Sequence, residues 1–134
     1  MSESRPDTLV RMVAEAKERV ENLSVGRVAD EIEGDNATLV DVREEDERLL
    51  EGAIANSIHV PRGMLELSAD PASPLYREEF DTERRLILYC SSGTRSALAG
   101  YTLWRMGYEK TAYLDGGMTA WKRDGRPVEM VDFG

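Results

Sequence analysis

Apolar residues recur at helical spacing in the first part of the chain. Over residues 7–22 they alternate with Arg, Lys and Glu every three or four positions, so one stripe can be buried while the rest is solvated. A second, shorter helix is expected over residues 25–33, because Gly, Asp and Asn follow it at 34–36 and tolerate the positive φ of a helix end. The pattern therefore predicts two helices before the first strand.

Short runs of β-forming residues alternate with helical segments through the rest of the chain. Strands are expected over 38–42, 57–60, 86–89 and 111–114, and helices over 44–50, 96–106 and 118–124. A loop is expected over 68–74 and a helical turn over 75–80. The run at 86–89 is apolar at both odd and even positions, as in a strand buried on both faces. This alternation predicts one α/β domain, with a mostly parallel central sheet and helices on both faces.

Length and composition agree with a single domain. The chain has 134 residues and 41% hydrophobic composition, enough for one core and too little for two ordinary ones. No stretch approaches the roughly 18 consecutive apolar residues that a membrane-spanning helix needs. The first residues show no basic patch followed by an apolar run, so we expect no secretory signal and a cytoplasmic location.

Charge and cysteine content narrow the classes of partner. A formal net charge of −9 makes generic binding to nucleic acid or to an anionic membrane surface unfavourable. A single Cys cannot form an internal disulfide, and with a single His it leaves too few soft ligands for a typical zinc site. We therefore expect no nucleic acid, no membrane and no metal as partners. An anionic substrate would need a locally positive pocket.

The chemistry is concentrated in the segment after the strongest strand, where residues 90–95 read Cys-Ser-Ser-Gly-Thr-Arg. Sites in open α/β sheets form at such strand-to-helix turns, and the unpartnered N–H groups of the helix's first turn favour an anion. Cys90, placed there near Arg95, is expected to be held as the nucleophilic thiolate. Gly93 lets the backbone bend. Small hydroxyl donors complete the loop: Ser91, Ser92 and Thr94.

A packing role is the alternative for Cys90. A lone cysteine after an apolar strand is, by residue type alone, more often a buried packing residue than a nucleophile. Packing does not require Gly93 three residues later, however, and a buried Arg95 guanidinium would be costly without an anion to meet it. We therefore interpret Cys90 as a nucleophile.

The order of these motifs resembles the rhodanese family of single-domain sulfurtransferases over about residues 24–128. The matching pieces are Asp-Val-Arg-Glu at 41–44, Gly52 and Ile54, Ile-His-Val-Pro at 58–61, the loop with the following Ser at 90–96, and Leu-Asp-Gly-Gly at 114–117 with Trp121. The resemblance implies a rhodanese-like domain over residues 24–134, preceded by an amphipathic helical extension over 1–23. It says nothing of oligomeric state.

The reaction that the resemblance implies is transfer of a sulfane sulfur. The Cys90 thiolate would take the outer sulfur of a donor such as thiosulfate, and the persulfide would pass it to a thiol, to cyanide or to an acceptor protein, with no cofactor. Cys90 and Arg95 are thus expected to be catalytic, and Asp41 to support the loop. The expected substrate-binding residues are Ser91, Ser92, Gly93, Thr94, Ser96 and Arg43. For Asp41 and Arg43, an ordinary ion pair at the strand end fits equally well.

Two other functions stay open. A cysteine-dependent phosphatase or arsenate reductase also uses a Cys…Arg loop before a helix, but with five intervening residues; here four intervene, a narrower cradle than a tetrahedral phosphate needs. A non-catalytic docking module would keep the fold, and such relatives commonly lack the cysteine. The chain also departs from the family's Gly-His-Ile-Pro-Gly-Ala pattern, since residues 52–57 read Gly-Ala-Ile-Ala-Asn-Ser. The loop into the second predicted strand should therefore differ in shape.

Overall fold

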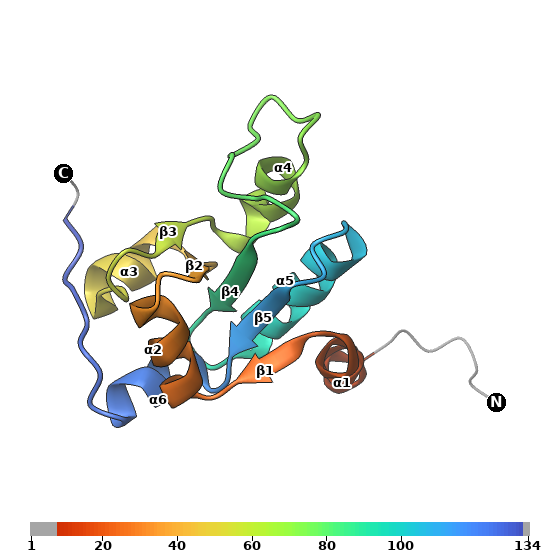
Figure 1. The fold of residues 1–134 in the computed structure, drawn as a ribbon. Coiled ribbons are helices and arrows are strands. Elements are labelled where there is room, and N and C mark those ends of the chain that lie inside the picture. Colours follow the sequence, from red (N-terminus) through yellow and green to blue (C-terminus); the bar gives the residue numbers. More distant parts are fainter. Residues whose placement is uncertain (1–7, 133–134) are drawn as a thin grey trace.

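Five parallel strands form the centre of the computed structural model, which describes residues 8–132. Their order in the sheet is β1-β5-β4-β2-β3, and every neighbouring pair is parallel (Figure 1). The strands are β1 (Glu21–Leu23), β2 (Ala37–Asp41), β3 (Ile58–His59), β4 (Arg85–Tyr89) and β5 (Thr111–Leu114). The helices are α1 (Leu9–Arg19), α2 (Val25–Glu33), α3 (Glu45–Glu51), the 3-10 helix η1 (Arg62–Met64), α4 (Leu65–Ala69), α5 (Thr94–Arg105) and α6 (Gly117–Arg123).

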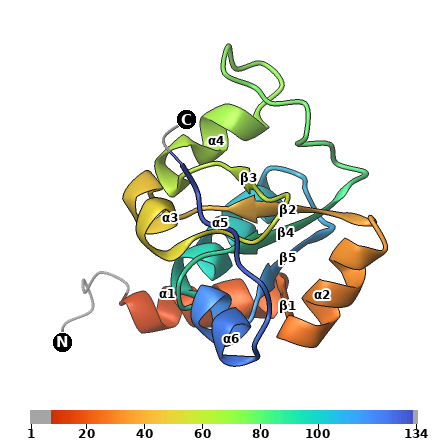
Figure 2. The same cartoon turned by 90° about the vertical axis from the view of Figure 1, so that its left-hand side faces the viewer.

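Helices cover both faces of the sheet, as Figures 1 and 2 show. On one face α1 and α5 pack through residues such as Ala16 and Leu103, and on the other α2 and α6 pack through Val28 and Trp121. Residues 86–89 of β4 are fully buried, because both layers rest on this strand. The predicted α/β class with helices on both faces is confirmed. Within residues 8–132, no helix combines the length and the apolar character needed to cross a membrane.

Parallel pairing brings the carboxyl ends of the central strands to one edge of the sheet. Asp41 of β2 lies opposite Tyr89 of β4, and Leu88 lies opposite Tyr113 of β5. Cys90, the residue after β4, is therefore placed between the turns that follow β2 and β5. This is the edge at which ligand sites form in parallel sheets.

The predicted N-terminal helix is too long at its carboxyl end. Helix α1 ends at Arg19, Val20 is extended with φ −112° and ψ 131°, and the next three residues form β1 beside β5. Leu23 is buried opposite Leu114. The three-residue spacing of Val20 and Leu23 fits one face of a helix, and β1 is too short to show a period of its own, so periodicity alone could not reveal the strand. The domain boundary placed at residues 23 and 24 stays a prediction.

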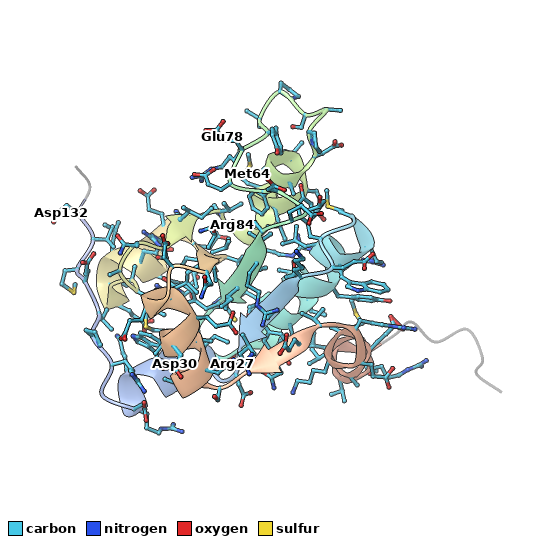
Figure 3. The ribbon with its side chains drawn as sticks, viewed as in Figure 1. Arg27, Asp30, Met64, Glu78, Arg84 and Asp132 are labelled. Atoms are coloured by element: carbon cyan, nitrogen blue, oxygen red, sulfur yellow. The ribbon has the colours of Figure 1, made fainter. Side chains whose placement is uncertain are left out.

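The segment between β3 and β4 also differs from the prediction. Helix α4 takes up the start of the expected loop, and residues 75–80 form turns in place of a helical turn. Tyr108 Oη donates to the carbonyl of Ala69, and its ring meets Phe80 edge-on at 6.0 Å. Tyr108 precedes β5, and the segment runs into the start of β4. This part of the segment therefore lies at the amino ends of the strands, opposite the end that carries Cys90. Figure 3 shows Glu78 at this end of the molecule.

Leu88→Ala should destabilise the protein by about 2–5 kcal/mol, because Leu88 is fully buried in the strand on which both layers pack. Urea unfolding followed by circular dichroism measures this change. Leu50→Ala is the matched control, since Leu50 is 80% exposed and its truncation should change stability by less than about 0.5 kcal/mol. Equal effects of the two substitutions would contradict this account of the core.

Candidate active site

The sulfur of Cys90 is buried against backbone N–H groups at the start of α5. Its Sγ accepts hydrogen bonds from the amides of Gly93 at 3.1 Å and Ser96 at 3.4 Å, and the residue is 1% exposed. The thiol donates to Ser96 Oγ at 3.5 Å, and that hydroxyl donates to the Gly93 carbonyl at 3.2 Å. Gly93 reaches this geometry with a φ of +103°. Donors that converge on one sulfur stabilise negative charge there.

The first turn of α6 fixes the outer side of the loop. The amides of Met118 and Thr119 donate to the carbonyls of Cys90 at 2.8 Å and Ser91 at 3.0 Å. The C=O and N–H of one peptide point in opposite directions. These bonds therefore turn the amides of Ser91 and Ser92 away from α6. Gly117 permits the contact, since a Cβ there would lie 2.4 Å from the Cys90 carbonyl oxygen. The Leu-Asp-Gly-Gly motif thus shapes the cysteine loop.

Arg95 forms a two-pronged ion pair with Glu47 of α3. Its Nη1 and Nη2 donate to the two carboxylate oxygens at 2.8 Å and 2.7 Å. Ser91 Oγ donates to the same carboxylate at 3.1 Å and accepts from Arg95 Nη2 at 3.3 Å. The hydrogen bonds from Arg95 lower the pKa of Glu47 to about 2, and those with Glu47 raise the pKa of Arg95. Glu47 was not among the predicted site residues.

A buried cluster behind the loop holds the turn from β2 to α3. Asp41 accepts hydrogen bonds from Arg43 Nε at 3.1 Å, Arg43 Nη2 at 2.9 Å and Arg48 Nη1 at 2.8 Å. Arg43 Nη2 also donates to the Gly52 carbonyl at 2.7 Å, and its guanidinium lies 5.5 Å from the Tyr89 ring centroid. Burial raises the pKa of Asp41, but these arginines more than offset it, and the pKa falls below its ordinary value.

Arg43 is therefore placed where it does not meet a substrate. Its side chain is fully buried and engaged with Asp41 and a backbone carbonyl, so we replace the predicted substrate contact with a structural role. Asp41 lies at the end of the strand beside β4, and its expected support of the cysteine loop stays a prediction. The loop itself gathers the remaining predicted residues: Cys90, Gly93 and Ser96 are buried, Ser91, Thr94 and Arg95 are partly exposed, and Ser92 is exposed.

Helix α1 adds an apolar wall beside the loop. Leu9 and Val10 are 57% and 78% exposed, and with Val13, Lys17 and Thr94 they line a groove next to the start of α5. The N-terminal helix thus borders the site from one side, while the polar contacts of α3 border it from another. It packs against α5.

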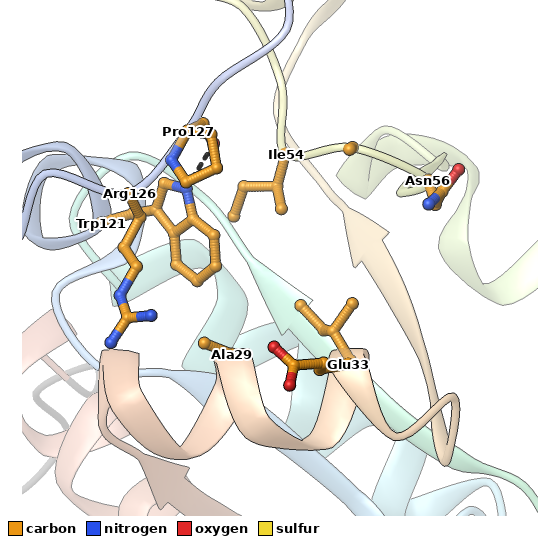
Figure 4. A pocket seen from close by; sticks show the side chains of 9 residues that line it. Ala29, Glu33, Ile54, Asn56, Trp121, Arg126 and Pro127 are labelled. Atoms are coloured by element: carbon orange, nitrogen blue, oxygen red, sulfur yellow. Dashed lines mark hydrogen bonds between the residues drawn. The ribbon is translucent and has the colours of Figure 1, made fainter.

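A separate pocket lies between α2 and the segment after α6 (Figure 4). Trp121 and Pro127 form one wall, joined by a 2.8 Å hydrogen bond from the indole N–H to the Pro127 carbonyl. Ile54 and Asn56 border it, and Asn56 adopts a φ of +64° where the family pattern has Gly. No residue of the 90–96 loop is among those that line this pocket, so we do not count it as part of the candidate active site.

Comparisons with known proteins find relatives with a rhodanese-like domain. The family model for the rhodanese-like domain matches residues 24–124. A sulfurtransferase of Allochromatium vinosum is 31% identical over 94 residues, which cover 70% of this chain and 79% of that protein. The polysulfide-sulfur transferase homodimer of Wolinella succinogenes has a TM-score of 0.71 and 32% identity, over 88% of this chain and 84% of that one.

One similar structure carries a different description. A protein of unknown function from Rhodopseudomonas palustris, described as a possible tyrosine phosphatase, has a TM-score of 0.89 and 32% identity. The match covers 96% of this chain and 99% of that one, so it includes more than the 24–124 segment of the family model.

Gly117→Ala should destabilise the protein by about 1–3 kcal/mol more than Gly125→Ala. Both glycines have positive φ, but a Cβ at Gly117 would clash with the carbonyls of Cys90 and Ser91, whereas a Cβ at Gly125 has nothing within 4 Å. Urea unfolding of the two variants isolates the close approach from the shared backbone cost. Equal stabilities would show that α6 does not constrain the loop.

The Glu47–Arg95 pair should make stability depend on pH in acid. The pKa of Glu47 is about 2 in the folded protein against an ordinary 4.5, so the unfolded chain binds the proton more readily. The stabilising contribution is complete above about pH 5 and is lost as the pH falls from 4.5 towards 2. The difference between the urea midpoints of wild type and Glu47→Gln should therefore shrink as the pH falls from 5 to 3 and vanish near pH 2, whereas Glu45→Gln, at an exposed position of α3, should follow wild type. Parallel profiles for Glu47→Gln and wild type would rule out the pair's contribution.

Proposed function

The chain belongs to the rhodanese-like domain family, and from that premise we propose that it is a sulfurtransferase that carries a sulfane sulfur as a persulfide on Cys90. The observation that carries the proposal is the setting of Sγ, which accepts hydrogen bonds from the amides of Gly93 and Ser96. Cys90 also belongs to the apolar core cluster, but a cysteine that only filled space would not need these two N–H donors. The sulfurtransferase named among the relatives, at 31% identity, supports the same activity.

The first half-reaction loads the sulfur onto the protein. The Cys90 thiolate attacks the outer sulfur of a donor, of which thiosulfate is the simplest, and the donor's S–S bond breaks. Sulfite leaves with the electron pair of that bond, and Cys90 holds the transferred sulfur as a persulfide. The N–H groups of Gly93 and Ser96 oppose the negative charge that rests on sulfur during this step.

The second half-reaction unloads it. A thiolate or cyanide attacks the terminal sulfur of the persulfide, the new S–S or S–C bond forms, and Cys90 leaves as the thiolate that began the cycle. No oxidant or reductant is consumed, because the transferred sulfur only changes its partner. The same backbone donors serve both halves, since the charge returns to the same Sγ.

Phosphate-ester hydrolysis is the second candidate, because the Rhodopseudomonas palustris structure is described as a possible tyrosine phosphatase. Two observations weigh against it. Four residues separate Cys90 from Arg95, which makes a small cradle. Both terminal nitrogens of Arg95 already bind Glu47, whereas a phosphate would need them for its own oxygens.

Incubation with a sulfane donor should add one sulfur atom to wild-type protein, and cyanide should remove it as thiocyanate. Cys90→Ser should gain no sulfur and lose turnover entirely, because Cys90 is the chain's single cysteine. Intact-mass spectrometry after thiosulfate or methanethiosulfonate makes the measurement, with p-nitrophenyl phosphate hydrolysis assayed in parallel.

Two outcomes would overturn the proposal. Wild-type protein that hydrolyses the phosphate ester and gains no sulfur from either donor would be a phosphatase. Protein that does neither would be a docking module that keeps the cysteine without using it.

A further inference from the structure

The guanidinium at the rim of the cysteine loop is already paired. Arg95 binds both oxygens of Glu47 at 2.8 Å and 2.7 Å. The carboxylate is itself held in place, because Glu47 Oε2 accepts the amide of Glu44 at 2.9 Å at the start of α3. The Glu47 side chain is 28% exposed and the Arg95 side chain 38%, so the pair is not sealed in the core. It lies at the rim of the cysteine loop, which we call the entrance.

The neighbouring cations are paired as well. Arg43 and Arg48 share Asp41, and Arg43 Nη1 also lies 3.5 Å from Glu51. On the α3 side of the loop, within the described part of the chain, each of these guanidiniums therefore faces a carboxylate. Lys17 lies on the other side, in the groove beyond Thr94, where it is exposed and its charge is screened by solvent.

Negative charge prevails at this entrance. Glu47 cancels Arg95, and the carboxylate of Glu44 adds a further charge that acts on Arg95. To bind Arg95, a dianion would have to displace Glu47 and leave that carboxylate without its partner. The pKa of Glu47, near 2, shows how strongly the carboxylate is held in its charged, paired form. A donor with less charge meets a smaller electrostatic penalty at the same sulfur.

We propose that Glu47 selects the class of sulfur donor: by neutralising Arg95 it disfavours dianions such as thiosulfate and favours sulfane donors with one negative charge or none, such as organic thiosulfonates and hydropersulfides. The inference rests on the proposed function. With a thiosulfonate, the Cys90 thiolate takes the outer sulfur, the S–S bond breaks, and the sulfinate leaves with its electron pair. The persulfide keeps the negative charge that the thiolate brought. Glu47 is a positioning residue here, since it acts through Arg95.

Thiosulfate and methanethiosulfonate make a matched pair of donors, because a methyl group replaces one charged oxygen and little else changes. The ratio of kcat/KM for thiosulfate to that for methanethiosulfonate, with cyanide as acceptor, measures discrimination by charge. Glu47→Gln should raise this ratio about five- to tenfold, mainly through a lower KM for thiosulfate, because the Arg95 charge is then unopposed. Glu45→Gln makes the same change in net charge at an exposed position of α3 and should leave the ratio within about twofold.

A ratio for Glu47→Gln equal to that of wild type and Glu45→Gln overturns the inference. If circular dichroism shows that Glu47→Gln does not fold, the donor ratio of the wild-type protein is the test. The reference is then the ratio of the rates at which the same two donors react with a small free thiol in solution. A wild-type ratio below the solution ratio supports the inference, and one equal to it or above it overturns it. Failure of the proposed function looks different, because then neither donor places sulfur on Cys90.

Discussion

The hydrogen bonds from the start of α6 to the carbonyls of Cys90 and Ser91 are the contacts on which the site depends. They tie the end of β4 to the turn after β5, so the shape of the loop is set by the sheet and not by the loop's own small residues. Gly117 makes the approach possible, since no side chain fits between the two segments. The same loop then runs into α5, where the amides of Gly93 and Ser96 donate to the sulfur.

A second link, from α3, sets the electrostatics of the entrance. The buried Asp41–Arg43–Arg48 cluster fixes the turn after β2, and α3 then carries Glu47 to Arg95 and Ser91. Strand order explains why these groups meet, since β2 is the neighbour of β4 in the sheet. The sulfur is thus held by neutral backbone donors, while the one arginine of the loop is matched by a carboxylate from a distant part of the chain.

Much of this could be predicted from the sequence where local pattern and tertiary structure agree. The bounds of α2 and β5 and the burial of β4 follow from apolar periodicity and turn residues. The pairing that turns residues 21–23 into β1 is not local, so it escaped prediction. The cysteine loop was visible from its spacing, but Glu47 was not, because it is one acid among several in α3 and only the fold distinguishes it from Glu45. Arg43 was expected at the substrate because of the family resemblance, and its burial was not visible in the sequence because it depends on packing around Tyr89.

The central claim is that backbone amides of the loop hold the reactive sulfur, and amide NMR tests it most directly. Proton–nitrogen spectra of wild-type protein are recorded before and after a donor has added one sulfur, which mass spectrometry verifies. The signals of Gly93 and Ser96 should shift most. Gly107, beyond the far end of α5, should stay in place. Sulfur bound to Cys90 with the Gly93 and Ser96 signals unmoved would contradict the account.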